Sequence, residues 1–178
     1  MQGPVFSQLR APGLTLIETK SGAAASYDFT NIPQEFSHLR IVMVGRGDAG
    51  GAALFLRFNN DTAANYDQQV FYNNSTTVAG VATAAATSMQ VATLTLSTST
   101  AGQAGVATID IPAYSGTTFR KTTTSQAGAF RTEGTASSYE AAVFAGNWRS
   151  TAAITRITAF LNTGNFAAGS VCSLYGMP

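Results

Sequence analysis

The side chains that could do chemistry are few and far apart in this sequence. There is one histidine, His38, one cysteine, Cys172, and nine acidic residues scattered singly. Acid–base catalysis needs paired groups in a pocket, and glycoside hydrolysis needs two carboxylates at a set separation. His38 has Glu35 as its sole acidic neighbour along the chain, and Cys172 alternates with an inward apolar set, where a thiol is unreactive. The sequence therefore predicts no enzyme, no catalytic residue and no cofactor.

The densest group of oxygen-bearing side chains lies between residues 59 and 67. Calcium binds several carboxylate and carbonyl oxygens, so this stretch is one place to look for an ion. Short acids and amides also cap turns with their own side chains, and this explanation is favoured because the stretch lacks a glycine for a sharp calcium loop. No metal is therefore expected. The candidate contacts for a bound ligand are Asn59, Asp61, Asn65, Tyr66 and Trp148.

A glycine-rich loop spans residues 45–51. Its glycines could cradle a phosphate, but no Gly-Lys-Ser/Thr follows, and residues 53–58 predict a strand where a phosphate loop needs a helix. The triplet Arg46-Gly47-Asp48 matches the tripeptide that integrins recognise, although matches of three residues are common by chance. Neither function is predicted for the loop.

The composition predicts a weakly charged surface. Ala, Thr, Ser and Gly make up 86 of 178 residues, charged residues are 11%, and the net charge is +1. Nucleic-acid binding needs clustered Lys and Arg, and Arg120-Lys121 is the sole adjacent pair, so no nucleic-acid partner is expected. Such a surface suits either a soluble monomer with a Thr/Ser-coated sheet or a chain packed against copies of itself. The second alternative is favoured.

Short β-prone segments separated by turn residues recur along the chain. They lie at 14–20, 26–30, 39–44, 53–58, 68–72, 105–112, 117–124, 153–161 and 166–176, with one or two more near 89–96. Residues 39–44 are apolar on both parities, which predicts a strand covered on both faces. Residues 81–89 fit either a strand or a short Ala-rich helix. Residues 162–165 predict a turn that joins the last two strands as a hairpin.

About ten strands without a convincing helix predict an all-β, antiparallel β-sandwich of Greek-key or jelly-roll topology. Trp148 is expected to anchor the two sheets, and Cys172 to lie in the core. The domain would span residues 14–178, after an extended N-terminal arm, residues 1–13. In this arm Val5, Phe6 and Leu9 offer apolar contacts.

The sequence start lacks an apolar signal-peptide core, and no apolar run approaches the length of a membrane span. Synthesis and folding in a cytoplasm are therefore expected, with no membrane partner.

Five motifs occur in one order along the chain: FTNIPQEFSHL (29–39), LRFNND (56–61) with NY (65–66), IDIPAY (109–114) with FRKT (119–122), ITRI (154–157), and NFAAGS (165–170) with LYG (174–176). In this order they resemble a group of virion structural proteins of tailed bacteriophages. The resemblance implies a single jelly roll, assembly as a homotrimer, and a place in the virion after assembly in the host cytoplasm. Members decorate capsids as cement or head-fibre proteins, or belong to tails and baseplates.

Two functions follow as expectations. The first is a capsid decoration protein, in which the arm, through Val5, Phe6 and Leu9, and the base of the domain bind the major capsid protein and stabilise the shell. The alternative is a receptor-binding tip of a tail fibre or baseplate, whose loops at 45–51 and 59–67, with Tyr66, Tyr72 or Trp148, bind host glycans.

Overall fold

The computed structural model describes residues 13–135 and 139–178, and the strands within them confirm the predicted all-β fold. These strands are β1 (Thr15–Ser21), β2 (Ser26–Phe29), β3 (His38–Gly45), β4 (Ala53–Phe58), β5 (Tyr66–Asn74), β6 (Thr77–Ala86), β7 (Met89–Thr93), β8 (Gly105–Pro112), β9 (Lys121–Phe130), β10 (Tyr139–Trp148), β11 (Ile157–Leu161) and β12 (Val171–Met177). The described residues contain no helix, and hence none long and apolar enough to cross a membrane.

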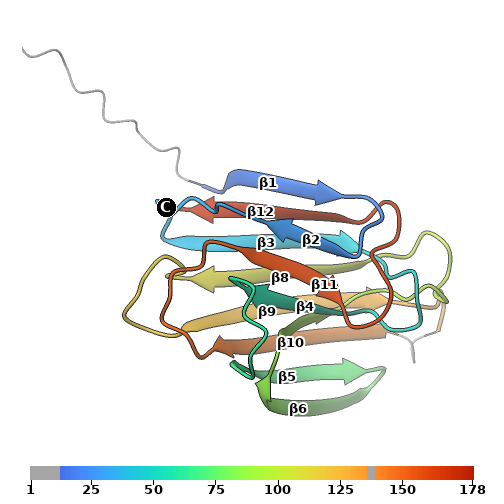
Figure 1. Cartoon of the computed structure of the whole chain (residues 1–178). Coiled ribbons are helices and arrows are strands. Elements are labelled where there is room, and N and C mark those ends of the chain that lie inside the picture. Colours follow the sequence, from blue (N-terminus) through green and yellow to red (C-terminus); the bar gives the residue numbers. More distant parts are fainter. Residues whose placement is uncertain (1–12, 136–138) are drawn as a thin grey trace, which may run out of the picture.

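The strands form two antiparallel sheets of unequal width that pack face to face (Figure 1). The larger sheet has eight strands in the order β1-β12-β3-β8-β9-β10-β5-β6, and the smaller has four in the order β2-β11-β4-β7. All the strand pairs within both sheets are antiparallel.

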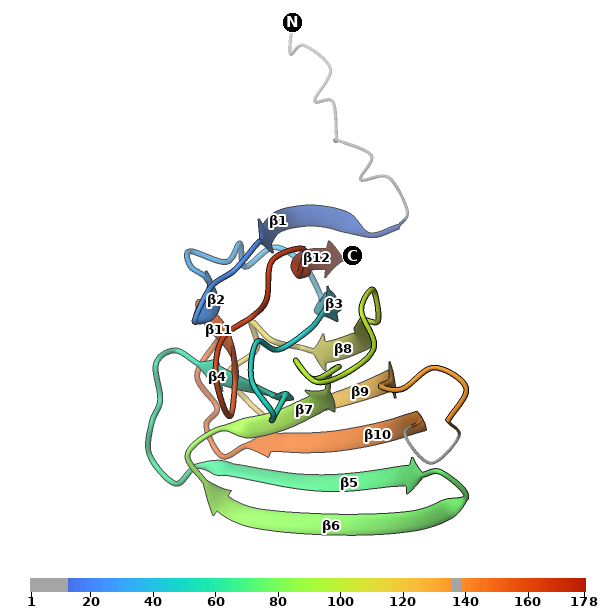
Figure 2. The same cartoon turned by 90° about the vertical axis from the view of Figure 1, so that its right-hand side faces the viewer.

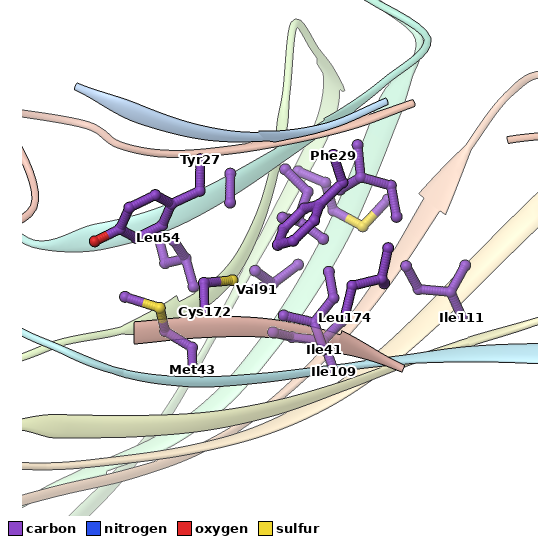
Figure 3. Packing of buried hydrophobic residues seen from close by; sticks show 14 of the residues in the cluster. Tyr27, Phe29, Ile41, Met43, Leu54, Val91, Ile109, Ile111, Cys172 and Leu174 are labelled. Carbon is purple, nitrogen blue, oxygen red and sulfur yellow. The ribbon is translucent and has the colours of Figure 1, made fainter. Parts of the chain in front are cut away.

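Alternating side chains build the core between the sheets, because successive residues of a strand point to opposite faces. In β3, the residues Leu39, Ile41 and Met43 are fully buried, and in β12 so are Cys172 and Leu174. Figure 3 shows Ile41, Met43, Cys172 and Leu174 meeting residues of the smaller sheet such as Leu54 and Phe29. The predicted core position of Cys172 is therefore confirmed.

The larger sheet extends beyond the smaller one at the end formed by β5 and β6. There β7 contacts β9 and β10 and touches β5 more lightly (Figure 2), and Ala86, at the end of β6, packs against the main core. A separate small cluster of Val70, Ala142 and Phe144 fills the space under β5 and β10. The β5–β6 hairpin is thus held mainly by its ladder to β10.

The predicted hairpin of the last two strands is wrong. β11 pairs with β2 and β4 in the smaller sheet, whereas β12 pairs with β1 and β3 in the larger one. The segment between them crosses from one sheet to the other, and on its way Phe166 makes isolated bridges to Ala24 and Gly47. Turn residues at 162–165 favour a reversal of the chain, but they do not specify which strand lies beside the reversed segment.

Two other expectations are corrected. Residues 81–89 form the end of β6, a turn and the start of β7, so the alternative of an Ala-rich helix is wrong. β3 is covered on one face alone: Leu39, Ile41 and Met43 are buried, whereas Val44 is 42% exposed. Its apolar residues of the second parity therefore face outward.

Candidate interaction surface

The outward side of the larger sheet, which we call the outer face, is the most distinctive surface of the described residues. Cross-strand register places its residues in three rows. From β12 to β6 the rows are Val171-Val44-Val106-Gly128-Ala141-Asn73-Val78, Ser173-Val42-Thr108-Gln126-Val143-Phe71-Gly80, and Tyr175-Arg40-Asp110-Thr124-Ala145-Gln69-Ala82. Residues directly opposite on neighbouring strands share one face, so each row lies on one side of the sheet.

Apolar side chains remain exposed along the first two rows. Val44, Val106 and Val171 lie directly opposite one another on three adjacent strands and are 42%, 51% and 37% exposed. On the same face, toward the β6 edge, Phe71 of β5 and Val143 of β10 lie directly opposite each other and are 60% and 50% exposed. Scattered exposed apolar residues are ordinary, but two groups of them, each in register on the same sheet face, favour an interaction site.

The charged residues of the three rows neutralise each other. Arg40 of β3 and Asp110 of β8 form two parallel hydrogen bonds, Nε to Oδ1 at 2.7 Å and Nη2 to Oδ2 at 2.9 Å. This bidentate geometry satisfies both oxygens of the carboxylate with one guanidinium. The outer face therefore carries no net charge across these rows, and a partner needs no complementary charge to cover it.

Three shallow hollows lie side by side on this face. One of about 450 Å³ is lined by Phe71, Asn73, Gln126, Ala141 and Val143, among others. A second of about 300 Å³ adjoins it through Gln126 and Val143 and reaches the Arg40–Asp110 pair. A third of about 470 Å³ lies over Ala82, Ala145 and Gly146. Small residues between larger ones thus leave hollows on the outer face, into which side chains of a partner can pack.

The structure places the candidate ligand residues of the 59–67 loop in internal contacts. Asn59 donates from Nδ2 to the Ala153 carbonyl, and its Oδ1 accepts from the backbone N–H groups of Thr155 and Arg156. Its φ of 51° is the left-handed conformation that asparagine tolerates in turns. Asn59 therefore ties this loop to the segment before β11.

Asp61 is the centre of the rest of the loop. Its carboxylate accepts hydrogen bonds from the backbone N–H of Ala63, from Asn65 Nδ2 and from the indole Nε1 of Trp148. The described residues hold no cluster of three or more metal-binding side chains, and the oxygens of this loop are used to fix the loop itself. The turn-capping explanation agrees with these contacts.

Tyr66 and Trp148 lie in the core, 0% and 3% exposed. Their rings stack with centroids 6.4 Å apart, and Trp148 meets the edge of Phe58 of the smaller sheet at 5.7 Å. The prediction that Trp148 anchors the two sheets is confirmed. The suggestion that these two rings contact a ligand is corrected, since burial leaves neither ring face for a ligand.

The remaining candidates of the sequence are also engaged. Arg46 donates to the carbonyls of Ser97, Ser99 and Thr100, and Asp48 accepts from the backbone and side chain of Asn165. The Arg46-Gly47-Asp48 triplet therefore links three loops. The arm candidates Val5, Phe6 and Leu9 lie outside the described residues.

Sequence reasoning missed the outer face as a site. Its signal was present in β3, where Val42 and Val44 made the strand apolar on both parities, and we expected a second layer of the same chain to cover them. For Phe71, Val106 and Val143 the alternation within each strand gives no such signal, because which parity faces inward depends on the sheet that packs above.

Comparison with known proteins gives little beyond this architecture. No protein-family model and no curated protein matches the chain. Among solved structures, the chain is similar to an exo-inulinase from Aspergillus awamori, with a TM-score of 0.42 and 8% sequence identity. The match covers 92% of this chain and 29% of the inulinase chain.

This match contradicts the prediction that the chain is not an enzyme, because the similar structure belongs to one. We therefore withdraw the exclusion of catalysis that the scattered acidic residues suggested. A likeness at this TM-score and identity carries no argument for inulin hydrolysis in this chain, and no activity is assigned from it.

Proposed function

We propose that the chain is a virion structural protein of a tailed phage: a jelly-roll decoration protein that binds the major capsid shell as an oligomer. The observation that carries this proposal is the outer face. It is a wide sheet surface with exposed valines in register and one self-neutralised ion pair, and burying it removes apolar area from water at about 25 cal/mol per Å² before association costs.

The order of strand pairing supports the jelly-roll part of the proposal. β1 pairs with β12, β2 with β11, β3 with β8 and β4 with β7, so each pair encloses the next along the chain. The first and third pairs lie in the larger sheet and the second and fourth in the smaller one. An antiparallel ribbon folded over in this way gives the two Greek keys of a jelly roll. The hairpins β5–β6 and β9–β10 are then insertions that widen one sheet.

The motifs that resemble phage virion proteins support the assignment to a virion. Many of their apolar residues are core positions of this fold, among them Phe29, Ile32, Phe36 and Leu39 of the first motif. The alternative of a glycan-binding tip has less support, because the rings of Tyr66 and Trp148 are buried. The homotrimer and the capsid partner remain predictions of the resemblance.

Binding of the purified protein to expanded, undecorated capsids of its phage, and to host cells, tests this function. Saturable capsid binding is expected, with weaker binding by Val106→Lys and by a variant that lacks residues 1–13. Phe119→Lys is the matched control, because Phe119 is 81% exposed in the loop between β8 and β9. Adsorption to cells without capsid binding would contradict the proposal and favour the receptor-binding tip.

A further inference from the structure

The free edge of β6 differs from the other three sheet edges. β1 is protected by a bulge between Leu16 and Glu18 and by the ion pair of Glu18 with Lys20. β2 and β7, at the edges of the smaller sheet, are four and five residues long. Charges, bulges and short length are the means by which proteins prevent strands from pairing at an edge.

β6 has none of these protections over most of its length. Its ten residues, TVAGVATAAA, contain no charge and no proline. Its register with β5 is unbroken from Thr77 to Thr83, and the irregularity lies at the far end, between Thr83 and Ala86. A long, uncharged edge strand with unbroken register offers a row of unpaired backbone N–H and C=O groups to another strand.

The side chains of β6 also lack burial of their own. No residue of β6 is buried, and Val78 and Val81, which point to opposite faces, are 61% and 50% exposed. Alanine and glycine have low strand propensity, so packing rather than propensity must stabilise such a strand. Within one copy that packing is confined mainly to the end of the strand, where Ala86 lies against the core, which indicates that a further strand completes the rest.

We propose that β6 pairs antiparallel with β6 of a second copy, so that two larger sheets join into one continuous sheet. A foreign peptide that adds to a sheet edge gains specificity from side-chain pockets, and the Ala, Gly and Thr side chains of β6 form none. Two identical uncharged edges with small side chains, related by a two-fold axis, can approach closely without pockets, and no charge opposes a like charge. The two outer faces then become neighbours, with the exposed Phe71 and Val78 close to the junction.

The inference goes beyond the proposed function, because it names the edge that joins copies and requires no capsid. Pairing through β6 joins two copies about a two-fold axis. A trimer is compatible with this pairing if two trimers join through their β6 strands into a hexamer.

Light scattering and hydrogen exchange of the isolated protein test the proposal. We expect an even number of copies at micromolar concentration, and amides of residues 77–83 that gain at least tenfold protection as concentration rises. The double variant Ala79→Lys with Val81→Lys should halve the mass while the fluorescence of Trp148 stays unchanged. Leu16→Lys on β1 is the matched edge control and should associate as the wild type does.

Three results would overturn the inference: a monomer at all concentrations, an unchanged mass of the double lysine variant, or association that Val143→Lys abolishes and the double variant preserves. The last result would place the contact on the outer face. Loss of capsid binding with intact β6 pairing would instead count against the proposed function alone.

Discussion

The indole Nε1 of Trp148 donates a 2.7 Å hydrogen bond to Asp61 Oδ2, joining the end of β10 to the loop after β4. Trp148 is 3% exposed and stacks on Tyr66. The hydrogen bond to Asp61 therefore satisfies the indole N–H at the rim of the core. The contact explains why a loop rich in acids and amides is structural.

Asp61→Ala should lower the free energy of unfolding by about 2 kcal/mol, because it leaves the buried indole N–H and the Asn65 amide without their acceptor. Urea unfolding followed by Trp148 fluorescence measures this, since Trp148 is the one tryptophan of the chain. Asp61→Asn keeps an acceptor and should lose less. Equal stability of Asp61→Ala and the wild type would show that the contact contributes nothing.

Lys121→Met should destabilise the protein by about 3 kcal/mol. Lys121 is 2% exposed. Its ammonium group donates to the carbonyls of Gly116, Phe119 and Thr151 at 2.6, 3.1 and 3.0 Å. Removing a buried charged donor leaves these acceptors unsatisfied. Thermal unfolding measures the change, with Arg120→Met as the neighbouring control, and a Tm equal to that of the wild type would refute the expected role.

Gly105→Ala should cost about 2 kcal/mol, whereas Gly128→Ala should be neutral or slightly stabilising. A Cβ at Gly105 would lie 2.8 Å from Leu94 Cα and 2.9 Å from Thr95 N, which are backbone atoms of the opposite layer and cannot move aside. At Gly128, on the outer face, the nearest atoms are 3.9 Å away. Chemical denaturation of both variants compares the two sites, and similar losses would contradict this packing.

Acid should weaken the contact between Asp67 and Arg149. Hydrogen bonds from the Arg149 guanidinium, and then from the backbone N–H of Ala85, lower the pKa of Asp67 to about 2. The unfolded chain then binds the proton more tightly, so this stabilisation is complete above about pH 4 and is lost as the pH falls toward 2. Carboxyl NMR titration of Asp67 measures the pKa directly. In the Asp67→Asn variant, the free energy of unfolding should change less with pH across this range. A pKa of Asp67 near 4 in the titration would contradict the lowered pKa.

The thiol of Cys172 should be unreactive in the folded protein. Burial raises its pKa to about 12, and the residue is 0% exposed. Labelling with a disulfide reagent at pH 8 should therefore follow global unfolding and rise with urea. Rapid labelling of the folded protein would show that the space around Cys172 opens on its own.

The sequence predicted the features that depend on residues near one another in the chain, such as which side of a strand is buried and where a strand ends. Parity along β12 was enough to place Cys172 and Leu174 in the core, and Pro112 marked the end of β8. It did not predict that β11 and β12 belong to different sheets, because that depends on register with distant β2 and β1. β6 was ambiguous because its alanines favour a helix whereas its threonines and valines favour a strand.

The candidate site shows the same division. Local composition drew attention to Asn59, Asp61 and Asn65; Asp61 and Asn65 cluster beside Trp148, whereas Asn59 binds the segment before β11. The outer face is assembled from residues such as Val44, Phe71 and Val143 on strands far apart in sequence. These rows form when the strands of the larger sheet pair in register. No single segment of the sequence therefore shows them.

The hairpin β5–β6 lies along the chain between β4 and β7, the hairpin β9–β10 lies between β8 and β11, and both widen one margin of the larger sheet. Both hairpins also reach the interior, since Tyr66 of β5 and Trp148 of β10 lie in the core. The width of the larger sheet and the packing of the core are therefore not independent, because β5 begins and β10 ends at an aromatic residue that belongs to the core.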